Sequence, residues 1–289
     1  MYAITGATGH VGGATAQALL TAGAPVRVIV RDPGKAQQWS DLGAEVAVAD
    51  LTDRTALAAA LVGCRGAFVM LPTVATFTGA DHRGMADSIA AAVAASDVPH
   101  VVMLSSVGAE LPDGTGPIRW LHHLENRLRE SGVLLTAIRA PHFQEKVESV
   151  LDAVTGTGTY PVFGDSADVA IPMVATQDVG AAAARALTLP PAVSEVVDLA
   201  APSYTERQVA ELLGAMLGRA VDVVTLPRPS WHDALVSAAV PPLLADELIA
   251  LYDADNRGVL RPCGDRRERC TTELEDTLRR VVRTATTAG

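Results

Sequence analysis

The stretch Tyr2-Ala3-Ile4-Thr5-Gly6-Ala7-Thr8-Gly9-His10-Val11-Gly12 decides the fold of this chain. Its first residues form a short apolar run that is typical of a buried strand. Its last residues open a helical pattern whose apolar face carries Ala16, Leu19 and Leu20. A strand, a G-x-x-G-x-x-G turn and a helix in this order are the arrangement that binds the pyrophosphate of a dinucleotide. The amino terminus therefore predicts a dinucleotide-binding site.

The three glycines of the motif have separate tasks. Gly6 permits the tight turn, Gly9 lets the backbone approach a pyrophosphate, and Gly12 lets the helix pack close to the strand. The start of the helix adds unpaired N–H groups and the positive end of its dipole, which favour phosphate. We therefore expect the cofactor to contact Gly6, Thr8, Gly9, His10 and Val11.

The bulk composition excludes several classes of protein. The chain has 289 residues, 49% of them hydrophobic, which allows one large domain or two unequal ones. No apolar run reaches the roughly 18 residues that cross a bilayer, and the strand at residue 2 leaves no room for a signal peptide. The net charge of −10 argues against nucleic acid and anionic membranes as partners. We expect a cytoplasmic protein that acts on a small molecule, with a homodimer as an open alternative to a monomer.

The cysteines give no sign of a metal centre. Cys64, Cys263 and Cys270 fit no metal-binding spacing, and their odd number does not suggest a disulfide framework. We expect no metal ion and three reduced thiols.

The first half of the chain alternates strand patterns with helix patterns. Expected strands are Tyr2–Thr5, Val26–Val30, Glu45–Val48, Ala67–Leu71, Val101–Ser105 and Leu134–Ile138. Helix patterns lie between them, near 11–22, 34–42, 54–62, 81–96 and 117–131. This alternation predicts an α/β fold with a parallel, doubly wound Rossmann-type sheet. Ligands of such sheets bind beyond the carboxyl ends of the strands, so the residues that end each strand are candidates for the site.

The second half, after about residue 141, has glycine- and proline-rich loops and shorter elements. Expected strands are Asp168–Met173, Val193–Leu199 and Val221–Leu226, and helix patterns lie at 177–187, 205–217, 230–239, 243–254 and 273–284. We predict an NADP-binding Rossmann domain over residues 1–142, with a returning segment near 165–190. A smaller C-terminal α/β substrate-binding domain is predicted over residues 143–289.

The end of the second expected strand indicates which dinucleotide binds. In NAD-binding proteins an acid at this point accepts a hydrogen bond from the ribose 2′-hydroxyl. Here the strand ends in Arg31, and Lys35 lies one helical turn further on. The guanidinium of arginine can donate two parallel hydrogen bonds to one phosphate group. This pattern therefore favours NADP(H) over NAD(H). The alternative is that Arg31 is an ordinary exposed arginine.

Other strand ends supply further candidates for contact with the cofactor. Asp50, beside Leu51, follows the third strand, where it could accept from the adenine amino group, cap the next helix, or do both. The remaining candidates end or follow the fourth, fifth and sixth strands: Leu71, Pro72, Ser105, Arg139 and Phe143.

Several motifs along the chain match those of one protein family. They are Thr5–Gly12, Val28–Asp32, Val101–Ser106, Glu125, Ser131–Arg139, Phe143 with Glu145, Asp178–Gly180, and Thr205 with Val209-Ala210. Through them, over roughly residues 1–260, the sequence resembles the NmrA-like branch of the atypical short-chain dehydrogenases/reductases. The resemblance implies a Rossmann-type domain that usually binds NADP(H), and a small substrate-binding domain. Members include NADPH-dependent quinone reductases, reductases of plant phenolic ethers, and redox-sensing regulators that bind cofactor without turnover.

The catalytic pair of ordinary short-chain dehydrogenases is absent. Those enzymes use a Tyr-x-x-x-Lys pair in which the tyrosine donates a proton to the carbonyl oxygen. The lysines of this chain are Lys35 and Lys146, and its tyrosines are Tyr2, Tyr160, Tyr204 and Tyr252. None lies in the segment after Ser106 where the pair belongs. Reduction of simple ketones by the usual route is therefore not expected.

Histidines are the candidates to replace the missing acid. An unperturbed imidazole titrates near pH 6.5 and can pass a proton at neutral pH. His142 follows the sixth strand, close to where nicotinamide is expected, and His122 and His123 lie on the helix after the fifth strand. We take His142, Ser106 and His122 as candidate catalytic residues. The alternative is that these histidines lie on the surface or in supporting positions.

Two functions from different classes agree with these observations. In the first, the protein is an NADPH-dependent oxidoreductase that transfers hydride to a small electrophile, such as a quinone, an enone or an imine. In the second, it is a non-catalytic sensor that binds NADP(H) and docks on a protein partner. The fold alone cannot separate them, because one fold hosts many functions. An apolar pocket beside the nicotinamide site favours the enzyme, and we expect the enzyme.

Overall fold

The main sheet has eight parallel strands and carries the glycine-rich turn at the end of its first strand. The computed structural model describes residues 1–288. In order across the sheet, the strands are β13 (Arg266–Arg269), β10 (Glu195–Ala200), β6 (Leu134–Ala140), β5 (His100–Ser106), β4 (Gly66–Val69), β1 (Tyr2–Thr5), β2 (Val26–Val30) and β3 (Glu45–Val48). All neighbouring pairs are parallel, so the carboxyl ends meet at one edge. The expected α/β fold with a parallel Rossmann-type sheet is confirmed.

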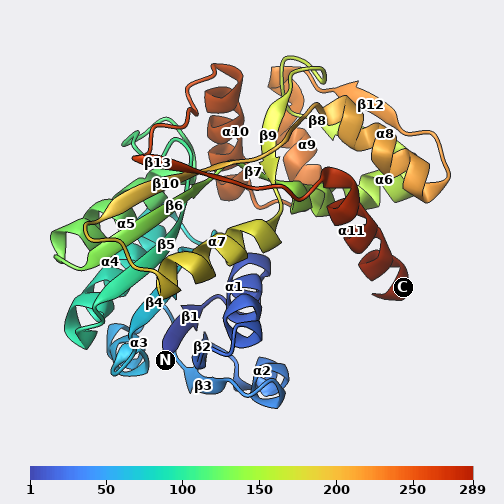
Figure 1. The fold of residues 1–289 in the computed structure, drawn as a ribbon. Helices are drawn as coiled ribbons and strands as arrows, with labels where there is room; N and C mark the ends of the chain where they lie inside the picture. Colours follow the sequence, from blue (N-terminus) through green and yellow to red (C-terminus); the bar gives the residue numbers. More distant parts are fainter. Residues whose placement is uncertain (289) are drawn as a thin grey trace.

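Helices cover both faces of this sheet (Figure 1). One face carries α1 (His10–Thr21) and α7 (Thr176–Thr188), and the other carries α3 (Arg54–Leu61), α4 (Gly79–Ser96) and α5 (Ile118–Glu130). Two shorter helices, η1 (Pro33–Lys35) and α2 (Gln37–Asp41), follow β2. Because both faces are covered, the central strands are mostly apolar rather than alternating, and every residue of β1 is buried.

Close packing of α7 on α1 holds the second half of the chain against the half that carries the glycine-rich turn. Gly180 of α7 lies against α1, where a Cβ built on it would lie 2.5 Å from the Cβ of Ala14. A side chain at this point would push the two helices apart. Glycine in Asp178–Gly180 is therefore needed for a close approach of backbones, although glycine inside a helix usually costs stability.

The remaining elements form smaller layers near the carboxyl edge of the main sheet. A three-stranded sheet contains β11 (Ser203–Tyr204), β9 (Ile171–Val174) and β7 (His142–Phe143), and a two-stranded sheet contains β12 (Asp222–Thr225) and β8 (Thr159–Val162). The helices here are η2 (Gln144–Val150), α6 (Leu151–Thr157), α8 (Glu206–Leu217), η3 (Arg228–Ser230), α9 (Trp231–Ser237), α10 (Pro242–Asn256) and α11 (Leu274–Ala288). Figure 1 shows α10 beyond the carboxyl edge of the main sheet.

The main sheet draws two strands from the part of the chain that the sequence assigned to the smaller domain. The strand expected at Val193–Leu199 is present as β10, but it pairs with β6 of the main sheet. β13 was not expected, because Arg266-Arg267-Glu268-Arg269 has no apolar pattern. Such a sequence suits an edge strand with one neighbour, where charge also discourages pairing with other chains. The division into two domains stays a prediction.

Candidate functional site

The glycine-rich turn has the geometry that the sequence predicted for its three glycines. Gly6 adopts φ +66°, a left-handed conformation that glycine enters without penalty. A Cβ on Gly12 would lie 2.3 Å from the carbonyl oxygen of Gly6, so only glycine lets α1 start this close to the turn. A Cβ on Gly9 would meet only that oxygen, at 3.5 Å. The chain itself therefore leaves space beside Gly9.

This space is suited to an anion. Thr8, Gly9 and His10 are exposed, while Val11 packs into the core at the start of α1. No side chain caps the amino terminus of α1, so its first N–H groups face the same space. Nearby, His10 Nε2 lies 3.0 Å from Glu148 Oε2 on η2, a contact that joins the turn to the second half of the chain.

The end of β2 presents two cations. Arg31 and Lys35 are exposed, and within residues 1–288 neither side chain forms a hydrogen bond or an ion pair. Asp32 accepts a hydrogen bond from Gly34 N and thereby caps η1, so it does not replace Arg31 at the strand end. The guanidinium of Arg31 is thus available to an external anion, and its contact with a 2′-phosphate stays a prediction.

Asp50 lies near this cationic strand end. Its Oδ1 accepts hydrogen bonds from the hydroxyl and backbone N–H of Thr52, and these bonds hold its pKa below the usual range, with the charge of Arg31 contributing. The helix cap is Asp53 instead, which accepts from Thr55 and Ala56. The suggestion that Asp50 caps α3 was therefore wrong, and its role toward adenine, with Leu51 beside it, stays a prediction.

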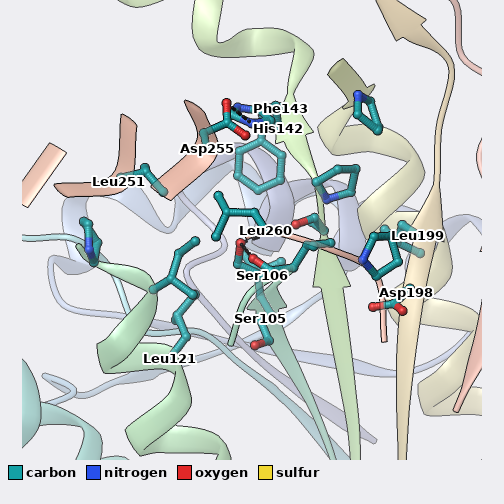
Figure 2. Close-up of a pocket in the computed structure, with 18 of the residues that line it drawn as sticks. Ser105, Ser106, Leu121, His142, Phe143, Asp198, Leu199, Leu251, Asp255 and Leu260 are labelled. Atoms are coloured by element: carbon teal, nitrogen blue, oxygen red, sulfur yellow. Dashed lines mark hydrogen bonds and ion pairs between the residues drawn. The ribbon is translucent and has the colours of Figure 1, made fainter. Parts of the chain in front are cut away.

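A cavity of about 680 Å³ opens at the carboxyl edge of the main sheet. Its walls are mostly apolar and come from β5, β6, β7, β9, β10 and β13, from the segment after β4, from the first turns of α5, and from one face of α10. Of the residues that the sequence singled out, Leu71, Pro72, Ser105, Ser106, His142 and Phe143 line it. Figure 2 shows Ser106, Phe143, Leu121 and Leu260 around this space.

His142 is held in the wall of this cavity by an acid. It begins β7 directly after Pro141, and its Nε2 lies 3.2 Å from Oδ2 of Asp255 on α10. Burial raises the pKa of Asp255, but the hydrogen bond and charge of His142, together with the charge of Lys146, outweigh burial and bring that pKa below its usual value. Asp255 is therefore ionised at neutral pH beside the ring of His142.

Ser106 and Ser105 differ in what their hydroxyls can offer. Ser106 Oγ donates to the carbonyl oxygen of Val107 at 3.0 Å and keeps its lone pairs for another donor. Ser105 is 2% exposed, and its hydroxyl donates to Glu125 Oε1 at 2.6 Å. Only Ser106 is in a position to orient a molecule in the cavity through its side chain.

Arg139 is committed to a buried ion cluster rather than to the cofactor. It donates to both carboxylate oxygens of Glu125 at 3.0 Å and to Glu110 at 2.9 Å, and it does not line the cavity. Its position at a strand end suggested a cofactor contact, but α5 supplies an acid that neutralises it. The assignment of Arg139 to the cofactor is corrected accordingly.

His122 and His123 also lie away from the cavity. His122 Nδ1 donates to the carbonyl oxygen of Ala109 at 2.8 Å, and its Nε2 is 2.9 Å from the amide nitrogen of Asn126. His123 contacts Asp87 on α4 at 3.0 Å. Both ring nitrogens of His122 are thus occupied, which removes it from the candidate catalytic residues.

Sequence reasoning missed Asp255, which lies on the apolar face of α10. Leu244, Leu248, Leu251 and Asp255 all line the cavity and are spaced at intervals of four, three and four residues. This spacing places them on one face of a helix, which is the signal that could have found them. The sequence could not indicate that this face lies against His142.

Metal ions have no evident site in the part of the chain that the structure covers. Within residues 1–288, no group of three or more His, Cys, Asp or Glu side chains is placed to hold one. Over the same residues, no helix combines the length and the apolar character that crossing a bilayer requires.

Comparisons with known proteins agree with this geometry. An NAD(P)H azoreductase from Xenophilus azovorans is 29% identical over 255 residues, covering 87% of this chain and 86% of that protein. The (4-alkanoyl-5-oxo-2,5-dihydrofuran-3-yl)methyl phosphate reductase of Streptomyces griseus is 31% identical, covering 84% and 83%. The solved structure of an NADPH-dependent quinone oxidoreductase from Escherichia coli, complexed with NADPH, superposes with a TM-score of 0.77 at 25% identity, covering 98% and 100%. The model of the NmrA-like family matches residues 2–274, and the chain therefore belongs to the NmrA-like family.

Proposed function

We propose that this protein is an NADPH-dependent oxidoreductase that reduces a small electrophilic acceptor, such as a quinone, an azo compound or an enone, inside the cavity at the carboxyl edge of the main sheet. The observation that carries the proposal is the position of this cavity. It lies next to the strand ends where a Rossmann-type sheet places its ligand, and it is lined by apolar side chains with one histidine–acid pair among them.

The residues at the other end of the site fit an NADP(H) molecule. The backbone around Gly9 leaves room for a pyrophosphate, and the uncapped start of α1 offers N–H groups to it. Arg31 and Lys35 are free to bind a 2′-phosphate, which supports NADPH over NADH. NADPH, when bound, supplies a hydride ion from its nicotinamide ring.

The side chains of the cavity have three tasks in this proposal. The apolar walls exclude water and hold an aromatic or conjugated acceptor by its surface. Ser106 orients the acceptor when its hydroxyl turns from the carbonyl oxygen of Val107 and donates to an oxygen or nitrogen of the acceptor. His142 donates a proton to the oxygen or nitrogen on which negative charge develops, which is the role that tyrosine fills in ordinary short-chain dehydrogenases.

The relatives support this class of acceptor. Their names describe an azoreductase, a quinone oxidoreductase and a reductase of an oxo-dihydrofuran phosphate. These activities are known for those proteins, and we extend only the shared class, NAD(P)H-dependent reduction of a small acceptor, to this chain. A cofactor sensor would need no space beside the strand ends, so the open cavity favours the enzyme.

A screen of acceptors tests the proposal. The purified protein is given NADPH with a quinone, an aromatic azo compound, an enone, a simple aliphatic ketone and, in the reverse direction, NADP⁺ with a secondary alcohol. Turnover of at least one of the first three, and none of the last two, is expected because the Tyr-x-x-x-Lys pair is absent. Efficient oxidation of the secondary alcohol, or binding of NADPH with no turnover of any acceptor, would contradict it.

A further inference from the structure

The contact between His142 and Asp255 joins two parts of the molecule that lie far apart in the sequence. His142 starts β7 beside the main sheet, and Asp255 lies in the last turn of α10. The side chains are 26% and 31% exposed, and both line the cavity. Figure 2 shows them next to each other and to Phe143. The pair therefore borders the space in which an acceptor would bind.

The contact decides which ring nitrogen of His142 carries hydrogen. An ionised carboxylate can only accept hydrogen bonds, so the approach of Asp255 Oδ2 to Nε2 is favourable only when Nε2 is protonated. Within residues 1–288, Nδ1 forms no hydrogen bond to another protein atom. The protonated ring can thus release the hydrogen on Nδ1 and still keep its bond to Asp255.

Charged side chains from several elements surround the pair. Asp255 is ionised at neutral pH, because its pKa lies below the usual value. Lys146 on η2 is the other charge that acts on Asp255, and it is ion-paired with Glu206 on α8, which also accepts a hydrogen bond from Tyr160 on β8. Asp198 and Arg267 line the same cavity from β10 and β13. Among these groups, Asp255 is the acid in contact with the ring.

We propose that Asp255 is a positioning residue that fixes His142 with hydrogen on Nε2, so that Nδ1 is the atom that delivers a proton to the reduced acceptor. This inference rests on the proposed function. The hydride brings two electrons and one proton to the acceptor, and negative charge develops on its oxygen or nitrogen. The Nδ1–H bond breaks as the new O–H or N–H bond forms. The ring is left neutral and regains its proton from water.

In this arrangement, proton delivery by His142 depends on the position of α10. Asp255 and three leucines of the cavity wall lie on this one helix, at Leu244, Leu248 and Leu251. The helix that encloses the acceptor also supplies the acid that prepares its proton donor. An acceptor that packs against these leucines therefore meets a His142 ring that Asp255 holds in a defined orientation.

Nitrogen-15 NMR of histidine in the cofactor-free protein tests the pair without reference to any activity. The His142 signals are assigned by their loss in His142→Gln. The neutral ring is expected to carry hydrogen on Nε2, and its titration midpoint is expected to move to lower pH by about one unit in Asp255→Asn. Asp246→Asn is the matched control, because it removes an exposed acid of the same helix that does not line the cavity. Hydrogen on Nδ1 of the neutral ring in the unmutated protein would overturn the proposal, whether or not the variant folds.

The pH profile of turnover adds a second readout. If a protonated His142 is required, kcat falls as the pH rises through the titration of the ring. In Asp255→Asn this basic limb is expected to move to lower pH by the same amount as the NMR midpoint, with the KM for NADPH within a few fold. A basic limb that stays in place while the NMR midpoint moves would show that the pair exists but does not deliver the proton. Absence of turnover in the unmutated protein would reject the proposed function. The NMR result would then decide only whether Asp255 fixes the position of hydrogen on His142.

Discussion

The glycine-rich turn and the cavity are two ends of one site, and they are built in different ways. The turn is made by consecutive residues, and it presents backbone N–H groups whose position depends on Gly6 and Gly12. The cavity is made by residues of six strands, of the helices α5 and α10, and of the segments that connect them. We therefore expect cofactor binding to depend on a few positions with strict steric requirements. We expect the choice of acceptor to depend on many apolar side chains that share the cavity wall.

The largest expected effect is at Gly9, where a side chain would fill the space of the pyrophosphate. Gly9→Val is expected to abolish binding of NADPH without unfolding the protein, because a Cβ there meets nothing closer than 3.5 Å within the chain. Calorimetric titration measures binding, and circular dichroism measures folding. Gly84→Val, on α4 in open space, is the control. A folded Gly9→Val that binds NADPH normally would show that the turn is not the cofactor site.

The next effect separates the chemistry of the cavity from cofactor binding. His142→Ala is expected to lower kcat by about 10²–10⁴-fold, the usual contribution of a general acid, while the Kd for NADPH stays within a few fold. His122→Ala is the matched control, since that ring is occupied by Ala109 and Asn126 away from the cavity. Equal losses of kcat in both variants would remove His142 from the proton-donor role.

A smaller effect is expected on cofactor affinity when Arg31 is replaced. Arg31→Ala removes a charge-assisted hydrogen bond of about 1.5–3 kcal/mol to the 2′-phosphate, which corresponds to a loss of about 10- to 150-fold in NADPH affinity. NADH affinity is expected to change little, because NADH lacks that phosphate. Fluorescence titration of both cofactors measures the difference. Equal affinity of the unmutated protein for NADPH and NADH would contradict the role of Arg31.

The smallest effect is at Ser106. Its hydroxyl donates to Val107, so a hydrogen bond donated to the acceptor replaces one that already exists within the protein. Ser106→Ala is expected to lower kcat/KM by about tenfold or less, in line with one ordinary hydrogen bond. Steady-state kinetics with a quinone measure this value. A loss as large as that of His142→Ala would mean that Ser106 takes part in proton transfer.

The sequence predicted the turn, the parallel sheet and the strand-end cations because each of these is a local pattern. Gly6, Gly9 and Arg31 are recognised by their spacing from a single strand or helix. The pairing of β10 with β6 could not be predicted, because an apolar strand pattern does not specify its neighbour. Arg139 was assigned to the cofactor because its partner Glu125 comes from a different element, and burial of that pair depends on how α5 packs.

Asp255 shows the same limit at the cavity. Its helix was expected, but contact with His142 depends on the placement of α10 over the sheet edge, which no local pattern encodes. Residues that act through tertiary contacts are therefore the ones that the sequence leaves unassigned.

An anaerobic single-turnover reaction tests the central claim, that hydride leaves the bound cofactor for an acceptor in this cavity. The protein is loaded with NADPH that carries deuterium at one or the other of its two C4 positions and is mixed with a quinone in a stopped-flow instrument. The account predicts that bound NADPH is oxidised in equal amount to the hydroquinone formed, and that deuterium slows the reaction at only one of the two positions, because the cavity lies on one side of the ring. NADPH that stays bound and reduced, or a rate that responds equally to deuterium at both positions, would contradict it.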